Sequence, residues 1–142
     1  MRVSRFTGRL TFEPALHYRM KKLKKKPSQT ATMRIWIERT IRSIPRGKVS
    51  TYGGIAKIAG YPRAARIVAS VLRRSYGLPW QRVLGAGGEI KLRGDSAIEQ
   101  RLRLEAEGIR FRGRRVDMKM HEFRPEGSNK RNSHRKTARN RS

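Results

Sequence analysis

The sequence of 142 residues contains no cysteine, few acidic residues and no long apolar run. Without cysteine the chain can form no disulfide, no cysteine-ligated zinc site and no thiol nucleophile, which fits a reducing compartment. No apolar run approaches the roughly 20 residues that cross a bilayer, so a transmembrane protein is excluded. The three histidines, which are His17, His121 and His134, are scattered, so we expect no metal ion and no cofactor.

Acidic residues are scarce beside basic ones: 10 Asp and Glu accompany 36 Lys and Arg, for a formal net charge of +26. Residues 1–30 carry nine basic side chains and one acid, and residues 128–142 carry six basic side chains and no acid. The middle of the chain keeps a net charge of +12. Such an excess predicts a polyanionic partner, most commonly nucleic acid, with an anionic membrane surface as the alternative.

The length and the distribution of apolar residues predict one folded domain over residues 31–124. Residues 1–30 sustain no helical period and include a run of lysines, so we expect a basic, irregular arm there. Residues 125–142 are polar and basic, which predicts a disordered tail.

Apolar spacing predicts a first helix over residues 32–44, begun by Thr32 and ended by Pro45. The same spacing places Trp36 in the core of the domain. We expect a second, short helix over residues 52–59, capped by Ser50 or Thr51 and ended by Gly60.

Residues 63–74 predict a third helix, opened by Pro62 and separated from the second by about three residues. Two helices joined so closely are typical of a helix-turn-helix. One face of the later helix carries a polar row that we expect to contact DNA, made of Arg63, Arg66, Ser70 and Arg73. Arginines and small residues favour contact with the DNA backbone or the minor groove over base reading in the major groove.

The second half of the domain predicts small β-hairpins and one further helix. Val83-Leu84 and Ile90–Leu92 flank a glycine-rich turn and predict a hairpin. A helix is expected from Asp95 or Ser96 to Gly108, with Ser96 and Glu99 in capping-box spacing, and with an inner face that includes Ile98, Leu102 and Ala106. Alternating apolar residues around Gly113 predict strands that include Ile109, Phe111, Val116, Met118 and Met120. The fold class is therefore mainly α with small β-hairpins.

Three ordered stretches resemble the C-terminal domain of the O6-alkylguanine-DNA alkyltransferases: residues 44–53 (IPRGKVSTYG), 62–66 (PRAAR) and 79–83 (PWQRV). The closer resemblance is to the alkyltransferase-like proteins, in which the reactive cysteine of the Pro-Cys-His-Arg motif is replaced, commonly by tryptophan. It extends from about residue 33 to about residue 111. It implies a winged-helix-like fold that enters the DNA minor groove with its second helix and rotates an alkylated guanine into a pocket.

The resemblance also implies roles for individual residues. Tyr52 corresponds to the tyrosine that turns the nucleotide at its phosphate, and Arg66 to the arginine that fills the vacated place in the duplex. Trp80 stands where the alkyl-accepting cysteine would be, and Arg93 corresponds to an arginine that contacts the flipped base. The predicted lesion pocket comprises Tyr52, Pro79, Trp80 and Arg93.

The residues around Trp80 predict a protein that is not an enzyme. Alkyl transfer needs an activated nucleophile, for which a thiolate is the natural choice, and an indole ring supplies none. Gln81 stands where the activating histidine of the alkyltransferases would be. Glu107 aligns with their triad glutamate, but without its partners we expect it to have a structural role, as we do for Arg82.

The resemblance implies a protein that binds duplex DNA containing O6-alkylguanine, flips the base without repairing it, and marks the site for nucleotide excision repair proteins. A base whose pairing is damaged costs less to flip, and stacking on an aromatic wall contributes about 1–3 kcal/mol. We expect a monomer, because no dimerisation helix is apparent. The expected location is cytoplasmic and nucleoid-associated if the source is bacterial, and nuclear if it is eukaryotic.

Three alternatives use the same scaffold. A non-specific nucleoid or architectural protein would share the charge and the helix-turn-helix but show no preference for the lesion. A transcription regulator would show sequence preference and dimerise. An alkyltransferase is disfavoured by the lack of cysteine, and a glycosylase would need an acid or a lysine in the pocket that no aligned position supplies.

Overall fold

The computed structural model describes residues 26–127, so most of both predicted basic arms lies outside the described residues. The chain divides into a unit that ends at Thr32 and a second unit that begins at Met33. Only residues 26–32 of the first unit are described, and they contain the start of the first described helix; the rest of the fold below is that of the second unit. Over residues 26–127, no helix combines the length and the apolar character that a membrane crossing requires.

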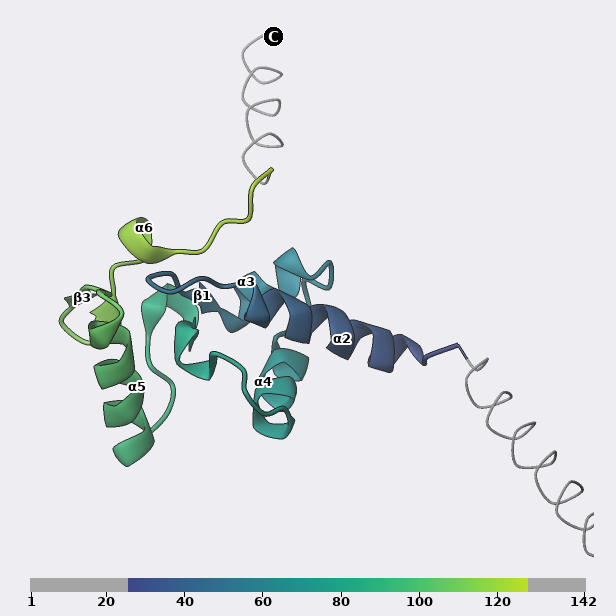
Figure 1. Cartoon of the computed structure of the whole chain (residues 1–142), viewed down its shortest axis with the longest axis horizontal. Helices are drawn as coiled ribbons and strands as arrows, with labels where there is room; N and C mark the ends of the chain where they lie inside the picture. Colours follow the sequence, from purple (N-terminus) through teal and green to yellow (C-terminus); the bar gives the residue numbers. More distant parts are fainter. Residues whose placement is uncertain (1–25, 128–142) are drawn as a thin grey trace, which may run out of the picture. The chain divides into compact units, whose positions relative to one another are not determined.

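The first described helix, α2 (Gln29–Arg42), begins before the predicted residue 32, because Ser28 caps it in place of Thr32 (Figure 1). The Ala31 N–H donates to Ser28 Oγ at 3.2 Å. The helix and the turn after it bury Ile37, Ile41 and Ile44. The prediction that Trp36 is a core residue is wrong: its side chain is 46% exposed. Successive residues of a helix point about 100° apart, so the ring beside buried Ile37 faces solvent.

Helices α3 (Tyr52–Ile58) and α4 (Ala65–Arg74) pack together and confirm the predicted helix-turn-helix. Thr51 caps α3 by accepting from the Gly54 N–H at 2.9 Å. Gly60 follows α3 with a φ of +92°, a left-handed conformation that glycine adopts at little cost. Helix α4 begins later than the predicted residue 63, because residues 61–64 form a turn closed by the Ala64 N–H to the Tyr61 carbonyl.

Strand β2 (Val83–Leu84) pairs with β1 (Ser50–Thr51) in parallel, with Ser50 opposite Val83. The predicted hairpin between residues 83–84 and 90–92 is therefore wrong. Both residues of β2 are buried, which is typical of a strand inside a parallel sheet. The glycine-rich turn instead forms the 3-10 helix η2 (Ala86–Gly88), which is closed by an antiparallel bridge between Gly85 and Glu89.

Helix α5 (Asp95–Ala106) differs from its prediction at its start and in its buried face. Gly94, with a φ of +61°, precedes it, and no side chain caps it, so the predicted capping box of Ser96 and Glu99 is absent. The predicted inner-face residues Ile98 and Leu102 are 60% and 61% exposed, and Ala106 is exposed too. The inner face carries Gln100 and Leu104 instead, so a polar residue occupies a core position that apolar spacing cannot reveal.

Beyond α5, β3 (Phe111–Arg112) and β4 (Arg115–Val116) form the antiparallel hairpin predicted around Gly113. The expected continuation of the strand through Met118 and Met120 is wrong, since residues Met118–His121 form the short helix α6. Asp117 begins that helix by accepting from the Lys119 N–H at 3.2 Å.

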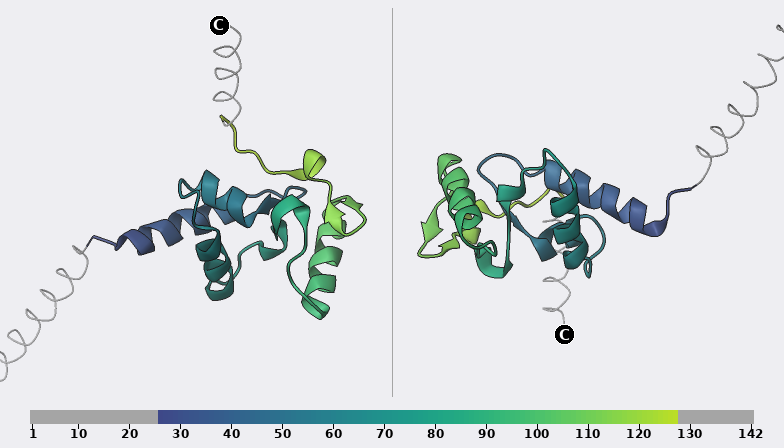
Figure 2. Two further views of the ribbon diagram at one scale, coloured as in Figure 1. Left: turned by 180° about the vertical axis from the view of Figure 1, so that it is seen from behind. Right: turned by 90° about the horizontal axis from the view of Figure 1, so that it is seen from below.

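Two clusters of buried side chains form the core, and β2 contributes to both. The larger cluster lies among α2, α3 and α4 and includes Val83, whereas the smaller one lies beside α5 and includes Leu84. Successive side chains of a strand point to opposite faces, so two adjacent residues join two cores. Figures 1 and 2 show the segment between α4 and α5, which contains this strand, passing between the helix-turn-helix and α5. That segment also carries Trp80.

Candidate nucleic-acid interface

Helix α4 presents most of the polar row predicted to contact DNA. Arg66 and Arg73 are exposed, and Ser70 is partly buried between them on the same helix. Arg34 of α2 donates from Nη2 to Ser70 Oγ at 3.4 Å, so a further arginine lies beside this row. Arg63 is exposed in the turn before α4, and it does not belong to the helix as predicted.

Tyr52 lies at the start of α3, where it is half-buried and close to Arg73 of α4. Burial raises the pKa of the Tyr52 hydroxyl, and the nearby Arg73 guanidinium opposes part of this rise. The hydroxyl therefore remains protonated at neutral pH and can donate a hydrogen bond to a phosphate oxygen. Two of the predicted DNA-contact residues therefore lie within electrostatic range of each other.

Trp80 begins the 3-10 helix η1 (Trp80–Arg82), which enters β2 directly. The Trp80 N–H donates to the Leu78 carbonyl at 2.8 Å, which fixes the backbone of the loop. The indole ring is partly exposed, and the Arg103 guanidinium of α5 lies over it, 5.5 Å from the ring centroid. The ring is therefore held at the surface by a cation–π contact.

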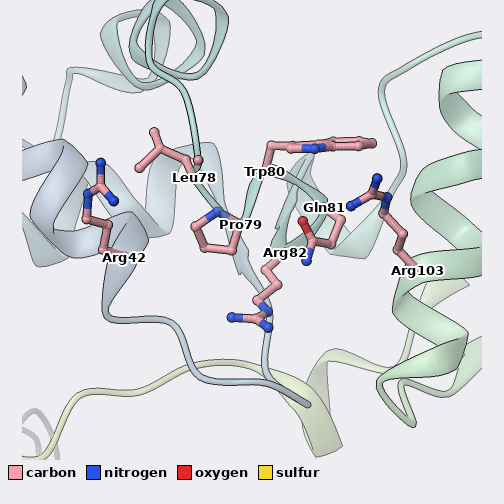
Figure 3. A pocket seen from close by; sticks show the side chains of 8 residues that line it. Arg42, Leu78, Pro79, Trp80, Gln81, Arg82 and Arg103 are labelled. Atoms are coloured by element: carbon pink, nitrogen blue, oxygen red, sulfur yellow. The ribbon is translucent and has the colours of Figure 1, made fainter.

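A hollow of about 600 Å³ lies beside Trp80. It is lined by Arg42, Gly77, Leu78, Pro79, Trp80, Gln81, Arg82 and Arg103 (Figure 3). The lining contains three arginines and no acidic residue. A volume of this size is typical of small-molecule pockets, and it exceeds that of a single nucleobase.

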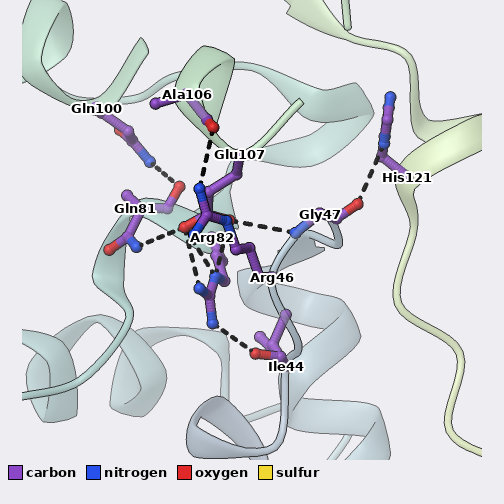
Figure 4. Close-up of polar contacts among 9 residues, drawn as sticks. All are labelled: Ile44, Arg46, Gly47, Gln81, Arg82, Gln100, Ala106, Glu107 and His121. Carbon is purple, nitrogen blue, oxygen red and sulfur yellow. Dashed lines mark hydrogen bonds and ion pairs between the residues drawn. The ribbon is translucent and has the colours of Figure 1, made fainter. Parts of the chain in front are cut away.

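Glu107, the residue after α5, joins the loop that carries Trp80 to the rest of the domain (Figure 4). Its carboxylate accepts from Gln81 Nε2 at 3.0 Å, from Arg82 Nε at 3.0 Å and from the Gly47 N–H at 3.3 Å. Arg82 also donates from Nη1 to the Ile44 carbonyl at 2.8 Å. The structural roles expected for Glu107 and Arg82 are confirmed, and Gln81 retains a hydrogen bond to the glutamate.

The environment of Glu107 favours its charged form. Burial alone would raise the pKa of the carboxyl, but the hydrogen bonds from Arg82, Gln81 and the Gly47 N–H outweigh it. The pKa of Glu107 consequently lies below its ordinary value of 4.5. The carboxylate is ionised at neutral pH and acts as a fixed acceptor that positions the loop.

Gln100 holds the same loop from the inner face of α5. Its side chain is 2% exposed, and Nε2 donates to the carbonyls of Gln81 and Val83, at 3.1 and 3.0 Å. Its Oε1 is buried and has no protein partner among the described residues. The Gln100 amide thus holds the backbone on both sides of Arg82, in the segment that directly follows Trp80.

A third connection reaches the loop from the C-terminal side of the domain. His121 Nε2 accepts from the Arg110 N–H at 3.0 Å, so Nδ1 carries the proton and donates to the Gly47 carbonyl at 3.2 Å. Gly47 in turn donates to Glu107. Gly47, through its carbonyl and its N–H, therefore links helix α6 to the residues that hold Trp80 (Figure 4).

Two of the four predicted lesion-pocket residues, Pro79 and Trp80, line the hollow together. Tyr52 and Arg93 do not line it, and Arg93 is exposed in the segment before α5. Sequence inspection missed Gln100 and Arg103. The i, i+4 spacing of Glu99 and Arg103 was visible as a potential salt bridge, but nothing in the sequence indicated that either α5 residue reaches the loop. In residues 26–127, no three His, Asp or Glu side chains are grouped so that they could hold a metal ion.

Part of the chain is similar in sequence to known proteins. The chain is 51% identical over 72 residues to a "DNA base-flipping protein" of Vibrio parahaemolyticus, an alignment that covers 49% of this chain and 72% of the relative. It is 46% identical over 83 residues to the Escherichia coli "DNA base-flipping protein", covering 56% of this chain and 63% of that one. The alignment thus spans less than two thirds of the Escherichia coli protein.

A solved structure supports the same relationship. The complex of the alkyltransferase-like protein of Schizosaccharomyces pombe with damaged DNA containing O6-carboxymethylguanine superposes with a TM-score of 0.57 and 29% identity, covering 66% of this chain and 95% of that protein. The predicted fold class, mainly α with a helix-turn-helix and small β-hairpins, is confirmed in its helical part and in the hairpin of β3 and β4, and the resemblance to alkyltransferase-like proteins is confirmed as well. Residues 32–109 match the family described as "6-O-methylguanine DNA methyltransferase, DNA binding domain", and the chain belongs to that family.

Proposed function

We propose that this protein is a non-catalytic sensor of O6-alkylguanine in duplex DNA. It binds through the minor groove with α4, rotates the damaged base out of the stack, and holds it against Trp80. The relatives named for base flipping and the structure of a relative bound to alkylated DNA support this proposal. Trp80, at the edge of a hollow and held in place by residues of α5, is the observation that carries it.

The chemistry of the loop supports binding without transfer. Trp80 stands where the family places its reactive cysteine, and the chain contains no cysteine elsewhere. Gln81 and Glu107 keep a hydrogen bond, but a primary amide cannot serve as a general base near neutral pH. The pair therefore positions the loop, and the alkyl group remains on the guanine.

A bound but unrepaired lesion needs another pathway to remove it. We propose that nucleotide excision repair proteins are the partners, with this protein marking the site as a monomer on distorted DNA. The corresponding location is the nucleoid in a bacterial cell and the nucleus in a eukaryotic cell. Co-purification with excision repair proteins that depends on alkylated DNA tests the partnership, and sedimentation with and without DNA tests the monomer.

The central test is competition between two duplexes that differ only by one O6-methylguanine in place of guanine, at about physiological salt. We expect tighter binding to the damaged duplex. Trp80→Ala should remove about 1–3 kcal/mol of that preference, the range for stacking of one base on an aromatic side chain. Trp36→Ala is the matched control, because it removes an exposed tryptophan on α2 that does not line the hollow.

Equal affinity of the unmodified protein for both duplexes would show that it coats DNA as a basic architectural module. Transfer of the alkyl group to the protein, detected by intact mass, would show an alkyltransferase. An abasic site in the DNA would show a glycosylase. Each of these three results contradicts the proposed function in a different way.

A further inference from the structure

Arg103 and Trp80 form a contact that the activity proposed above does not assign. The Arg103 guanidinium lies 5.5 Å from the centroid of the indole ring. Glu99, one turn earlier on α5, holds this guanidinium through Nη2, with a distance of 2.7 Å to its carboxylate oxygen. The Glu99 carboxylate therefore orients the guanidinium that lies over the aromatic ring. Figure 3 shows Arg103 beside Trp80.

The backbone beneath Trp80 is already fixed without this contact. Gln100 holds the carbonyls of Gln81 and Val83, and Glu107 holds the side chains of Gln81 and Arg82. None of these bonds involves the indole ring of Trp80. In the part of the chain that the structure describes, Arg103 is the cation placed over the Trp80 ring, so it is well placed to restrict the ring's orientation.

The orientation of the Trp80 ring affects the space available in the hollow, because Trp80 and Arg103 both line it. A ring pinned against Arg103 keeps a fixed wall, whereas a free ring could rotate to make space for a larger group. We propose that Arg103 is a positioning residue for alkyl specificity: by holding Trp80 in one orientation, it limits the size of the O6 substituent that the site accepts. This inference rests on the proposed function.

The alternative is a purely structural role for Arg103 in its pair with Glu99. Both side chains are about half exposed, and exposed i, i+4 pairs contribute little to stability. A structural role therefore predicts a nearly unchanged protein when Arg103 is replaced, with the same ranking of DNA ligands. A positioning role predicts an unchanged fold and an altered ranking.

The test compares the affinities of the full chain for three duplexes, which carry guanine, O6-methylguanine or O6-benzylguanine at one position. Arg103→Gln should shift the ratio of the benzyl to the methyl dissociation constant by about two- to fivefold in favour of the benzyl lesion, the range that an exposed cation–π contact allows. Arg103→Lys, which keeps a cation over the ring, should restore part of the original ratio.

Arg39→Gln is the matched control. Arg39 lies over the ring of Trp36 at 5.4 Å, on α2, and does not line the hollow. The substitution removes the same charge and the same kind of contact. We expect it to weaken binding to all three duplexes equally, if at all, and to leave the benzyl-to-methyl ratio unchanged.

A spectroscopic measurement reports the ring directly. In a Trp36→Phe background, Trp80 is the remaining tryptophan, since the chain has two. Arg103→Gln should raise the acrylamide quenching of its emission and lower its anisotropy, with the far-ultraviolet circular dichroism unchanged. Addition of the O6-methylguanine duplex should reduce the difference between the variants.

The outcomes separate the inference from the function on which it rests. If the unmodified protein shows no lesion preference, the proposed function fails. If it prefers the lesion, but Arg103→Gln changes neither the benzyl-to-methyl ratio nor the quenching, the sensor function stands and the role of Arg103 is overturned. If Arg39→Gln shifts the ratio as much as Arg103→Gln does, the effect is one of charge and the positioning role is overturned as well.

Discussion

Arg82 and Glu107 form a bidentate ion pair, although their positions in the sequence differ by 25. Arg82 Nε donates to both carboxylate oxygens, at 3.2 and 3.0 Å, and Nη2 donates to one of them at 3.0 Å. Arg82 ends η1 and Glu107 follows α5. The pair therefore fixes the loop that carries Trp80 to the end of a helix.

Replacement of Glu107 by Gln should lower the free energy of unfolding by about 1.5–3 kcal/mol, because a largely buried arginine loses its charged partner. Urea denaturation measures this loss. Glu105→Gln is the control, since Glu105 forms an exposed pair with Arg101 on the same helix and should change stability by less than about 1 kcal/mol. If the two substitutions lower the free energy of unfolding equally, the buried pair contributes no more to stability than the exposed pair does.

The low pKa of Glu107 makes a prediction about acid stability. A carboxyl whose pKa is lowered by folding stabilises the folded state above its unfolded value of 4.5, and this contribution disappears as the pH falls through the lower, folded value. The unfolding free energy of the unmodified protein should therefore decline below about pH 4.5 more steeply than that of Glu107→Gln. Denaturant titrations between pH 7 and pH 3 provide the measurement, and parallel curves for the two proteins would contradict it.

Much of the DNA-binding half could be predicted from the sequence because its helices follow regular apolar spacing. The stripe of Ile37, Ile41 and Ile44, the capping of α3 by Thr51 and the glycine turn at Gly60 all appear in the structure. The same rule misplaced Trp36, because hydrophobicity does not state which of two neighbouring apolar residues faces inward. The strand pairing of Val83 with Ser50 joins residues far apart in the chain, and local patterns carry no information on such partners.

The α5 side of the site could not be predicted, for a physical reason. The buried positions on this helix belong to Leu104 and to Gln100, whose amide satisfies two backbone carbonyls, while Ile98 and Leu102 face solvent. The hydrogen bonds that the loop carbonyls require, together with the burial of Leu104, select this face. Glu107 could be placed from the family resemblance, but its contact with Gln81 could not, because the expected partner was a histidine.

Two glycines with similar backbone conformations offer a measurement of close packing. Gly60 and Gly88 have φ values of +92° and +83°, and a methyl group at Gly60 would meet nothing within 4 Å. At Gly88 it would lie 2.7 Å from the Val116 carbonyl oxygen and 3.0 Å from Met118. Gly60→Ala should cost about 1–2 kcal/mol of stability from the left-handed conformation alone.

Gly88→Ala should lower the free energy of unfolding by about 1–3 kcal/mol more than Gly60→Ala does, because the added methyl group clashes with the Val116 carbonyl oxygen, which is backbone and cannot move freely. Thermal and urea denaturation of both variants give the difference, and lesion binding of the folded fraction should be retained by Gly60→Ala. If Gly88→Ala lowers stability less than Gly60→Ala does, the η2 turn can shift away from β4.

The arginines of α4 should control how strongly salt weakens DNA binding. Each phosphate contact releases counterions, so Arg73→Ala should reduce the slope of log K against log salt concentration by about 0.9 and weaken binding to damaged and undamaged duplexes alike. Arg66→Ala should instead reduce the preference for O6-methylguanine, because the family resemblance implies that this side chain occupies the place that the flipped base leaves. Arg101→Ala on α5 removes the same charge from a side chain that stacks on Phe111 and pairs with Glu105, and it should leave the slope unchanged. If the salt dependence of binding has the same slope for Arg73→Ala and Arg101→Ala, the DNA lies on a surface other than α4. If Arg73→Ala lowers the slope and Arg66→Ala removes the preference for O6-methylguanine, Arg73 contacts a phosphate and Arg66 acts in the step that turns the base out.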